Sequence, residues 1–90
     1  MCYIMDYMLS VQEDIVCNVK KRRKEFGLSQ QELAKRSGVS YGSIKRFETK
    51  GDISLGSLIK IAFVLNCEND FNQLFSRKNY HSIDEIINEK

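Results

Sequence analysis

Hydrophobic residues recur every three or four positions along most of this chain, which is the spacing of amphipathic α-helices. No stretch sustains the two-residue alternation of a half-buried strand. Proline is absent and only five glycines occur, so long segments are free to be helical. The pattern predicts an all-α fold with five or six helical segments, the last of them short and near the C-terminus.

The first predicted helix runs from about Val11 to Phe26. We expect Ile15, Val19 and Phe26 to form its inward stripe, because their spacing brings them to one side of a helix. Gly27 follows as a residue that can take the left-handed conformation and end the helix.

The second predicted helix opens with the letters SQQE, which form a capping box. In such a box the hydroxyl of Ser29 accepts from the backbone N–H three residues on, and the carboxylate of Glu32 accepts from the N–H of Ser29. This helix is expected to end near Ser37.

The third predicted helix covers about residues 40–48 and follows a tight turn at residues 38–39. Ser40 is its N-terminal cap, and Ile44 and Phe47 are expected to face the core. The letters TKGDI after it predict a loop.

The fourth predicted helix covers residues 54–65. Its expected core face consists of Leu55, Leu58, Ile61, Ala62 and Leu65. Ile59, Phe63 and Val64 widen the apolar surface beyond what one core face requires. Two interpretations stay open: residues 70–75 fold back and cover these side chains, or the side chains form a surface for a second copy or another partner.

Near the C-terminus, Ser82 and Glu85 form a second capping box. The short helix that it opens would carry Ile83, Ile86 and Ile87, which need a partner surface. We expect one main domain at residues 14–76, with an N-terminal extension at 1–13 and a C-terminal extension at 77–90.

Ninety residues with 42% hydrophobic and 29% charged residues fit a single soluble globular domain. The three cysteines are far apart and lack a CxxC spacing, so we expect reduced thiols, no zinc site and a cytoplasmic protein. The segment MCYIMDYMLS is too short to span a bilayer and lacks the basic flank of a signal peptide.

The net charge of +2 is unevenly distributed. Residues 14–50 contain ten Lys or Arg against four Asp or Glu, whereas both flanking parts are acidic. A basic middle of this kind is typical of a surface that meets a polyanion such as DNA.

Two short helices joined by a glycine turn, the second capped by serine and rich in basic side chains, can place a helix in the DNA major groove. The segments RRKEFGLSQQELAKRSGVSYGSIKRFE and SLGSLIKIAFVLN resemble the XRE family, the Cro and phage-repressor type of helix-turn-helix regulators. The resemblance covers about Ile15 to Phe75. It implies a five-helix domain that binds operator DNA, usually as a homodimer, with the third helix contacting bases.

Within that resemblance, Arg23 and Glu48 match a pair that links the first helix to the end of the recognition helix. Gln30 matches a glutamine that bonds a DNA phosphate, and Ser37 departs from the family by replacing an apolar residue. In the run KKRRK at 20–24, successive residues point about 100° apart, so only one or two of them are expected to reach phosphate.

With Ile44 turned inward, the opposite side of the third helix is the side that a groove would meet. The residues predicted to contact bases are Tyr41, Gly42, Lys45 and Arg46. Tyr41 is equally explained as a half-buried side chain over the turn. The residues predicted to contact phosphate are Gln30, Ser40, Ser43 and Lys50.

No motif indicates an enzyme, a cofactor or a metal: His81 is the only histidine, and no glycine-rich phosphate loop occurs. Three hypotheses remain. The chain is a DNA-binding repressor acting as a homodimer, an antitoxin similar to the HipB-like partners of HipA-type kinase toxins that also represses its operon, or an interaction module that no longer binds DNA.

Overall fold

The computed structural model describes residues 2–76, and this part of the chain is entirely helical. Its five helices are α1 (Cys2–Glu25), α2 (Gln30–Ser37), α3 (Tyr41–Lys50), α4 (Leu55–Val64) and α5 (Glu68–Asn72). No strand occurs between residues 2 and 76. The predicted all-α class and the five helices of the main body are confirmed.

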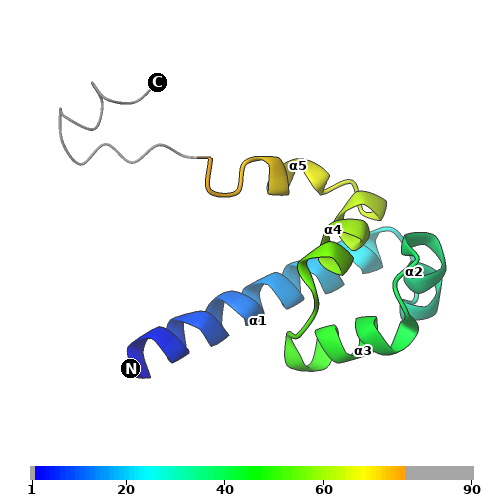
Figure 1. The fold of residues 1–90 in the computed structure, drawn as a ribbon. Coiled ribbons are helices and arrows are strands. Elements are labelled where there is room, and N and C mark those ends of the chain that lie inside the picture. Colours follow the sequence, from blue (N-terminus) through cyan, green and yellow to red (C-terminus); the bar gives the residue numbers. More distant parts are fainter. Residues whose placement is uncertain (1, 77–90) are drawn as a thin grey trace, which may run out of the picture.

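Helices α2, α3 and α4 pack together beside the C-terminal half of α1, and α5 adjoins α4 (Figure 1). The N-terminal half of α1 projects away from this group. The core is a cluster of apolar side chains from the end of α1 through α4: Leu28, Leu33, Val39, Ile44, Ile61 and Leu65. Because these side chains come from all three packed helices and the turns between them, the core fixes α3 relative to α2 and α4.

Helix α1 begins at Cys2 and not near Val11, so it is 24 residues long. Residues 2–10 contain no glycine or proline, and nothing in them competes with helix formation. The segment predicted as an extension is therefore, from residue 2 on, the first part of α1.

The predicted inward stripe of α1 is correct only for Val19, which packs against the core. Ile15 and Phe26 are 39% and 40% exposed. Ile15 faces an open groove between α1, α4 and α5, and the ring of Phe26 lies 5.8 Å from the guanidinium of Arg22. The prediction that Ile15 and Phe26 face inward was wrong, because no helix covers this side of α1 within the described residues.

The predicted capping box of α2 and the glycines predicted to end α1 and α2 are confirmed. The hydroxyl of Ser29 accepts from the N–H of Glu32 at 3.1 Å, and the Glu32 carboxylate accepts from the N–H of Ser29 at 2.9 Å. The backbone N–H of Ser29 lowers the pKa of the Glu32 carboxyl most strongly, followed by the Ser29 hydroxyl, and a negative charge is so kept at the start of α2 where the helix dipole favours it. Gly27 and Gly38 adopt φ values of 68° and 78°, which suit glycine.

Helix α3 extends two residues further than predicted, to Lys50, and ends at Gly51 with φ 79°. In α4, Ser54 is the cap and Ile61, Ala62 and Leu65 are buried as predicted. Leu55 was assigned to the core face but is 62% exposed, because as the first residue of α4 it lies before the turn at which the helix meets the core.

The three apolar side chains that widen the surface of α4, Ile59, Phe63 and Val64, have different surroundings. Val64 is half-buried against the core, whereas Ile59 and Phe63 are 41% and 68% exposed. Residues 70–75 do not cover these two side chains, since α5 and the turn after it leave Leu74 and Phe75 exposed as well. The predicted helix with Ile83, Ile86 and Ile87 lies outside the described residues.

Candidate nucleic-acid interface

Helices α2 and α3 are joined by a turn at Gly38 and Val39. The N–H of Gly38 donates to the carbonyl of Ala34 at 2.9 Å, which closes the last turn of α2. Val39 is buried, and Ser40 then begins α3 by accepting from the N–H of Ser43 at 3.1 Å. The turn is therefore held by a buried side chain on one side and by caps on both helices, which fixes the angle at which α3 leaves it.

Ser37, the departure from the family pattern, has a role of its own in this turn. Its hydroxyl donates to the carbonyl of Leu33 at 2.7 Å and accepts from the N–H of Val39 at 3.2 Å. A polar side chain thus satisfies two backbone groups at the place where an apolar residue was expected.

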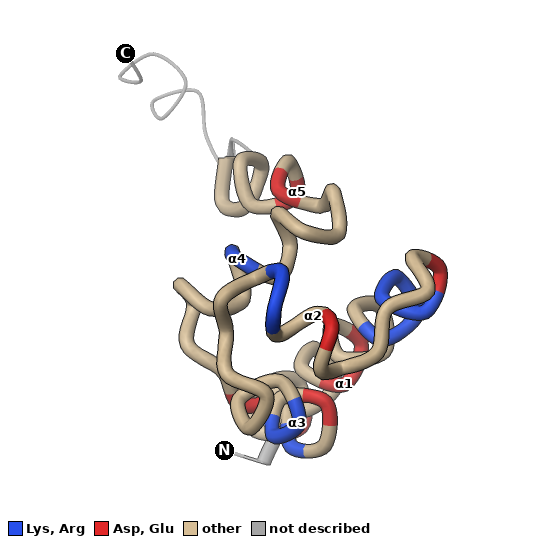
Figure 2. The backbone as a smooth tube through the Cα atoms, turned by 90° about the vertical axis from the view of Figure 1, so that its right-hand side faces the viewer, with Lys and Arg blue, Asp and Glu red and all other residues tan. Residues whose placement is uncertain are grey.

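The inner side of α3 is fixed by its core contacts. Ile44 and Phe47 are 0% and 2% exposed. The opposite side is open to solvent; we call it the outer face of α3, and it consists of Gly42, Lys45, Arg46 and Thr49. Figure 2 shows the basic positions of α3 at the lower end of the molecule.

The charged side chains of the outer face have neighbours on the protein itself. The ammonium of Lys45 lies 5.7 Å from the ring centre of Tyr41, which is 40% exposed at the edge of this face. Nη2 of Arg46 lies 3.6 Å from Oδ2 of Asp52, and both side chains are more than half exposed. Exposed pairs of this kind contribute about 0–1 kcal/mol, so a DNA phosphate or base can replace them at little cost.

Gly42 is the one residue of the outer face without a side chain. A Cβ atom built on it meets nothing within 4 Å, so the backbone there is open to solvent and tolerates a side chain. Its φ does not require glycine.

Arg23 and Glu48, which sequence analysis singled out, are in contact. Nε and Nη2 of Arg23 donate to the two carboxylate oxygens of Glu48 at 2.9 and 3.0 Å, and Nη1 donates to the carbonyl of Leu28 at 2.8 Å. The side chains are 10% and 2% exposed. The pair ties α1 to the last turns of α3 in a two-bond geometry that lysine could not provide.

Gln30 joins the same network, because its side-chain amide donates to Oε1 of Glu48 at 2.7 Å. Of the other residues predicted to contact phosphate, Ser40 and Ser43 share a bond between their hydroxyls at 2.8 Å, and Lys50 is exposed at the end of α3. These residues lie at the two ends of α3 and at the start of α2.

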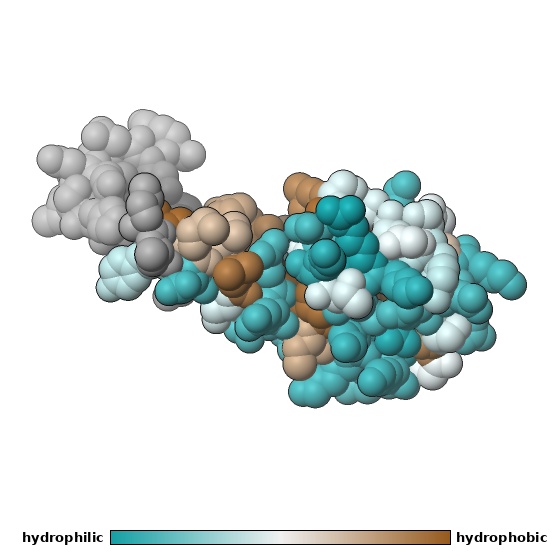
Figure 3. All heavy atoms as spheres, turned by 90° about the horizontal axis from the view of Figure 1, so that it is seen from below, coloured by the Kyte–Doolittle hydropathy of each residue, from teal (hydrophilic) through white to brown (hydrophobic). Residues whose placement is uncertain are grey.

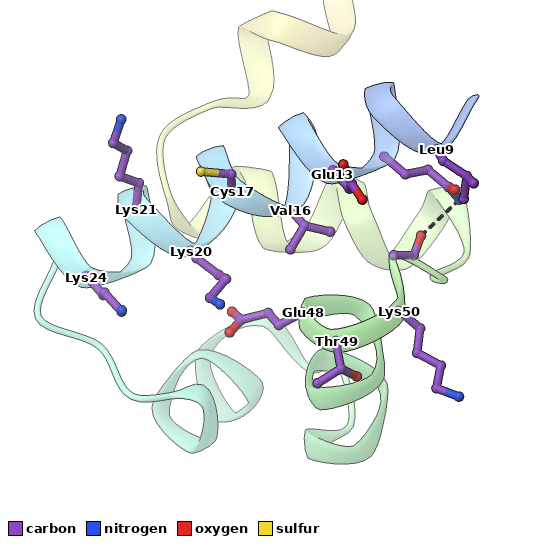
Figure 4. Close-up of a pocket in the computed structure, with 12 residues that line it drawn as sticks. Leu9, Glu13, Val16, Cys17, Lys20, Lys21, Lys24, Glu48, Thr49 and Lys50 are labelled. Atoms are coloured by element: carbon purple, nitrogen blue, oxygen red, sulfur yellow. Dashed lines mark hydrogen bonds between the residues drawn. The ribbon is translucent and has the colours of Figure 1, made fainter. Parts of the chain in front are cut away.

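The side chains of the basic run at 20–24 lie in different surroundings. Arg23 is buried, while Arg22 donates to the carbonyl of Leu65 at 3.2 Å. Lys20, Lys21 and Lys24 line a groove of about 460 Å³ between α1 and the end of α3 (Figure 4). In this view Lys21 points away from α3. The division agrees with the prediction that the run has no common direction.

Two contributors to this region were not predicted. Gln12 of α1 donates to the carbonyl of Gly51 at 3.3 Å and so holds the end of α3, and Asp52 pairs with Arg46. Both contacts join residues that are distant in sequence or lie in a loop, and no local pattern marks them.

Among residues 2–76, no group of histidine, cysteine or acidic side chains is arranged to hold a metal ion, and no helix is long and apolar enough to cross a membrane.

A helix-turn-helix family model, HTH_3, matches residues 19–69, which is more than half of the chain. The matched segment runs from the second half of α1 into α5 and contains the turn, the outer face of α3 and the Arg23–Glu48 pair. No curated protein and no solved structure gives a match. The arrangement of α2 and α3 and the family match lead to one conclusion: the chain belongs to the XRE family of DNA-binding helix-turn-helix regulators.

Proposed function

We propose that the chain is a transcriptional repressor that binds a palindromic DNA site as a homodimer. The observation that supports this proposal best is the outer face of α3, where Lys45 and Arg46 are exposed on a helix whose other side is buried in the core. A helix held in this way keeps its position when it enters the major groove. Half-sites for such a dimer lie about 10 base pairs apart, one turn of DNA.

In this proposal the bases are contacted from the first two turns of α3. Arg46 leaves Asp52 and donates to guanine O6 and N7, and Lys45 contacts the neighbouring base edge. Tyr41 packs against a thymine methyl group. Gly42 allows the backbone of α3 to approach the floor of the groove, because no side chain stands between them.

The phosphates are contacted from the ends of the helices. Gln30 lies in the first turn of α2, where unpaired N–H groups and the helix dipole favour an anion. Ser40 and Ser43 at the start of α3 and Lys50 at its end lie on either side of the outer face. Contacts at both ends would set the depth and the angle of α3 in the groove.

Selection from a random DNA library tests the proposal, with a footprint on the DNA upstream of the chain's own coding region as a second measurement. We expect a palindromic motif to be enriched and the upstream region to be protected. Equal binding to scrambled DNA at every salt concentration would contradict sequence-specific recognition.

Gly42→Gln is expected to change the selected sequence and to weaken binding to the original site by about tenfold. The domain should stay folded, because the added side chain meets open space and glutamine forms helix better than glycine. Gly56→Gln is a matched control, since Gly56 also lies in a helix with open space beside it but on α4. An unchanged motif in the Gly42 variant would mean that this position does not face the bases.

A second candidate function is that of an antitoxin, which binds a toxin protein and represses its own operon. Leu55, Ile59 and Phe63 favour it, because they are four residues apart on α4, exposed, and outside the outer face of α3. Purification from the native host would separate the two functions. A toxin that leaves the complex in the Phe63→Glu variant supports the antitoxin, and a wild-type chain that is isolated without any partner contradicts it.

A further inference from the structure

The N-terminal half of α1 carries an apolar surface that nothing in the described chain covers. Ile4, Met8, Val11 and Ile15 lie four, three and four residues apart and are 72%, 43%, 37% and 39% exposed. We call these four residues the α1 stripe. Seen from below, brown and tan residues are mixed with hydrophilic ones toward the projecting end, whereas the opposite end is mostly hydrophilic (Figure 3).

The spacing of the α1 stripe is that of the a and d positions of a coiled coil, which is the narrow seam along which two helices meet. One seven-residue repeat further on, the equivalent positions are Asn18 and Arg22, which are polar. The seam therefore ends where α1 enters the domain, and the part that projects is the part built to meet another helix.

We propose that the α1 stripe pairs with the α1 stripe of a second copy of this chain, with the two helices antiparallel. This inference deepens the homodimer of the proposed function and rests on it, but the pairing needs no DNA.

The exposed area is sufficient for such a dimer. The α1 stripe and its flanking side chains Met5 and Tyr7, which are 56% and 72% exposed, present on the order of 600 Å² per chain. Two copies then reach the lower end of the range of about 1,200–2,000 Å² that stable interfaces bury. Side chains that line the groove between α1, α4 and α5 add to this area.

The antiparallel direction follows from the position of the domain on α1. Parallel helices would bring both domains to the same end of the pair, where α3 packs against α1 and where α4 and α5 line a groove with it. Antiparallel helices place the domains at opposite ends. Met8 then faces Val11 of the other copy, and Ile4 faces Ile15.

This pairing also provides contacts at both edges of the seam. Ile15 lines a groove of about 650 Å³ with Leu58 and Leu74, so the Ile4 end of the second copy would lie at an apolar wall. Tyr7 would lie beside Asp14 of the second copy, where the phenol hydroxyl can donate to the carboxylate. No pair of like charges faces each other in this register.

Sedimentation equilibrium of the full chain, without DNA, tests the proposal. Wild type is expected to be a dimer, and Val11→Glu to raise the dimer dissociation constant by about 100-fold or more, because the carboxylate would be buried against Met8. The helix should persist, since Val11 is already partly exposed and glutamate favours helix, and circular dichroism checks this. Phe63→Glu, on α4, is the matched control and should remain a dimer.

A mixture of two variants tests the direction. Met8→Lys and Val11→Glu should each be monomeric alone, and together they should form a heterodimer, because the antiparallel register brings the new lysine beside the new glutamate. A monomeric wild type, a dimer unaffected by Val11→Glu, or a dimer lost in Phe63→Glu would overturn the inference. No heterodimer in the mixture would overturn the antiparallel register.

DNA binding is measured separately, so the two proposals can fail independently. Val11→Glu should bind a single half-site as tightly as wild type and lose only the added affinity for the palindrome. A wild type that dimerises but binds no DNA would contradict the proposed function and leave the α1 pairing supported.

Discussion

Arg23→Met is expected to lower the free energy of unfolding by about 3–5 kcal/mol, which is the largest effect of any single change considered for this fold. The substitution leaves the Glu48 carboxylate 2% exposed with only the Gln30 amide as a partner, and the carbonyl of Leu28 loses its donor. Domains of this size have total stabilities of about 5–15 kcal/mol, so a large share would be lost. Urea denaturation, monitored by circular dichroism, measures this loss in the free energy of unfolding.

The double variant Arg23→Met/Glu48→Leu is the control for this prediction. Because it removes the buried charge together with its partner, it should recover most of the lost stability. If Arg23→Met cost less than about 1 kcal/mol, Glu48 would have to reach solvent or another cation, and the pair would not be the tie between α1 and α3 that its geometry indicates.

Reversing two charges on the outer face of α3, with Lys45→Glu and Arg46→Glu together, is expected to lower DNA affinity by about 100-fold or more at moderate salt. Two attractive groups become repulsive, and the base contacts proposed for Arg46 are lost. The fold should not change, because both side chains are exposed and Arg46 loses only its weak pair with Asp52. Titration of a labelled operator at several salt concentrations gives the affinity and its salt dependence.

Lys21→Glu/Lys60→Glu makes the same change in net charge and is the matched control. Both lysines are exposed, and neither belongs to the outer face of α3. An equal loss in the control would mean that DNA is attracted by net charge alone. Undiminished affinity in the variant of α3 would favour the hypothesis of an interaction module that does not insert this helix into DNA.

Features that depend on neighbouring residues could be predicted from the sequence. The capping box of Ser29 and Glu32 and the left-handed glycines at 27 and 38 follow from local chemistry. Ile44 and Phe47 were assigned to the core because two apolar residues three positions apart on a short, otherwise polar helix leave little choice of inner face. The outer face of α3 followed from the same geometry.

Features that depend on what surrounds a helix could not be predicted in the same way. A wheel of α1 shows that Ile15 and Phe26 share a side with Val19, but not that this side meets an open groove. Leu55 continues the apolar pattern of α4 and yet lies before the core begins. The start of α1 was placed too late because residues 2–10 lack any signal that separates a helix from the extension before it.

The contact between Arg23 and Glu48 was suggested by resemblance to a family, since the two residues lie 25 positions apart and no spacing rule joins them. The bond from Gln12 to Gly51 and the pair of Arg46 with Asp52 have no signal of that kind. They depend on how the loop after α3 is placed, which only the folded chain determines.

The bond between Gln30 and Glu48 has a consequence for the protein without DNA. A carboxylate only accepts hydrogen bonds, so Glu48 selects the rotamer of Gln30 in which the nitrogen, and not the oxygen, faces α3. One amide hydrogen is used, and the second stays free for an acceptor that arrives from outside. The entropy of choosing between the two flipped amides is thus lost during folding. In the proposed complex it need not be lost again when Gln30 meets a phosphate, so an acidic residue that DNA would repel would prepare a donor for that phosphate.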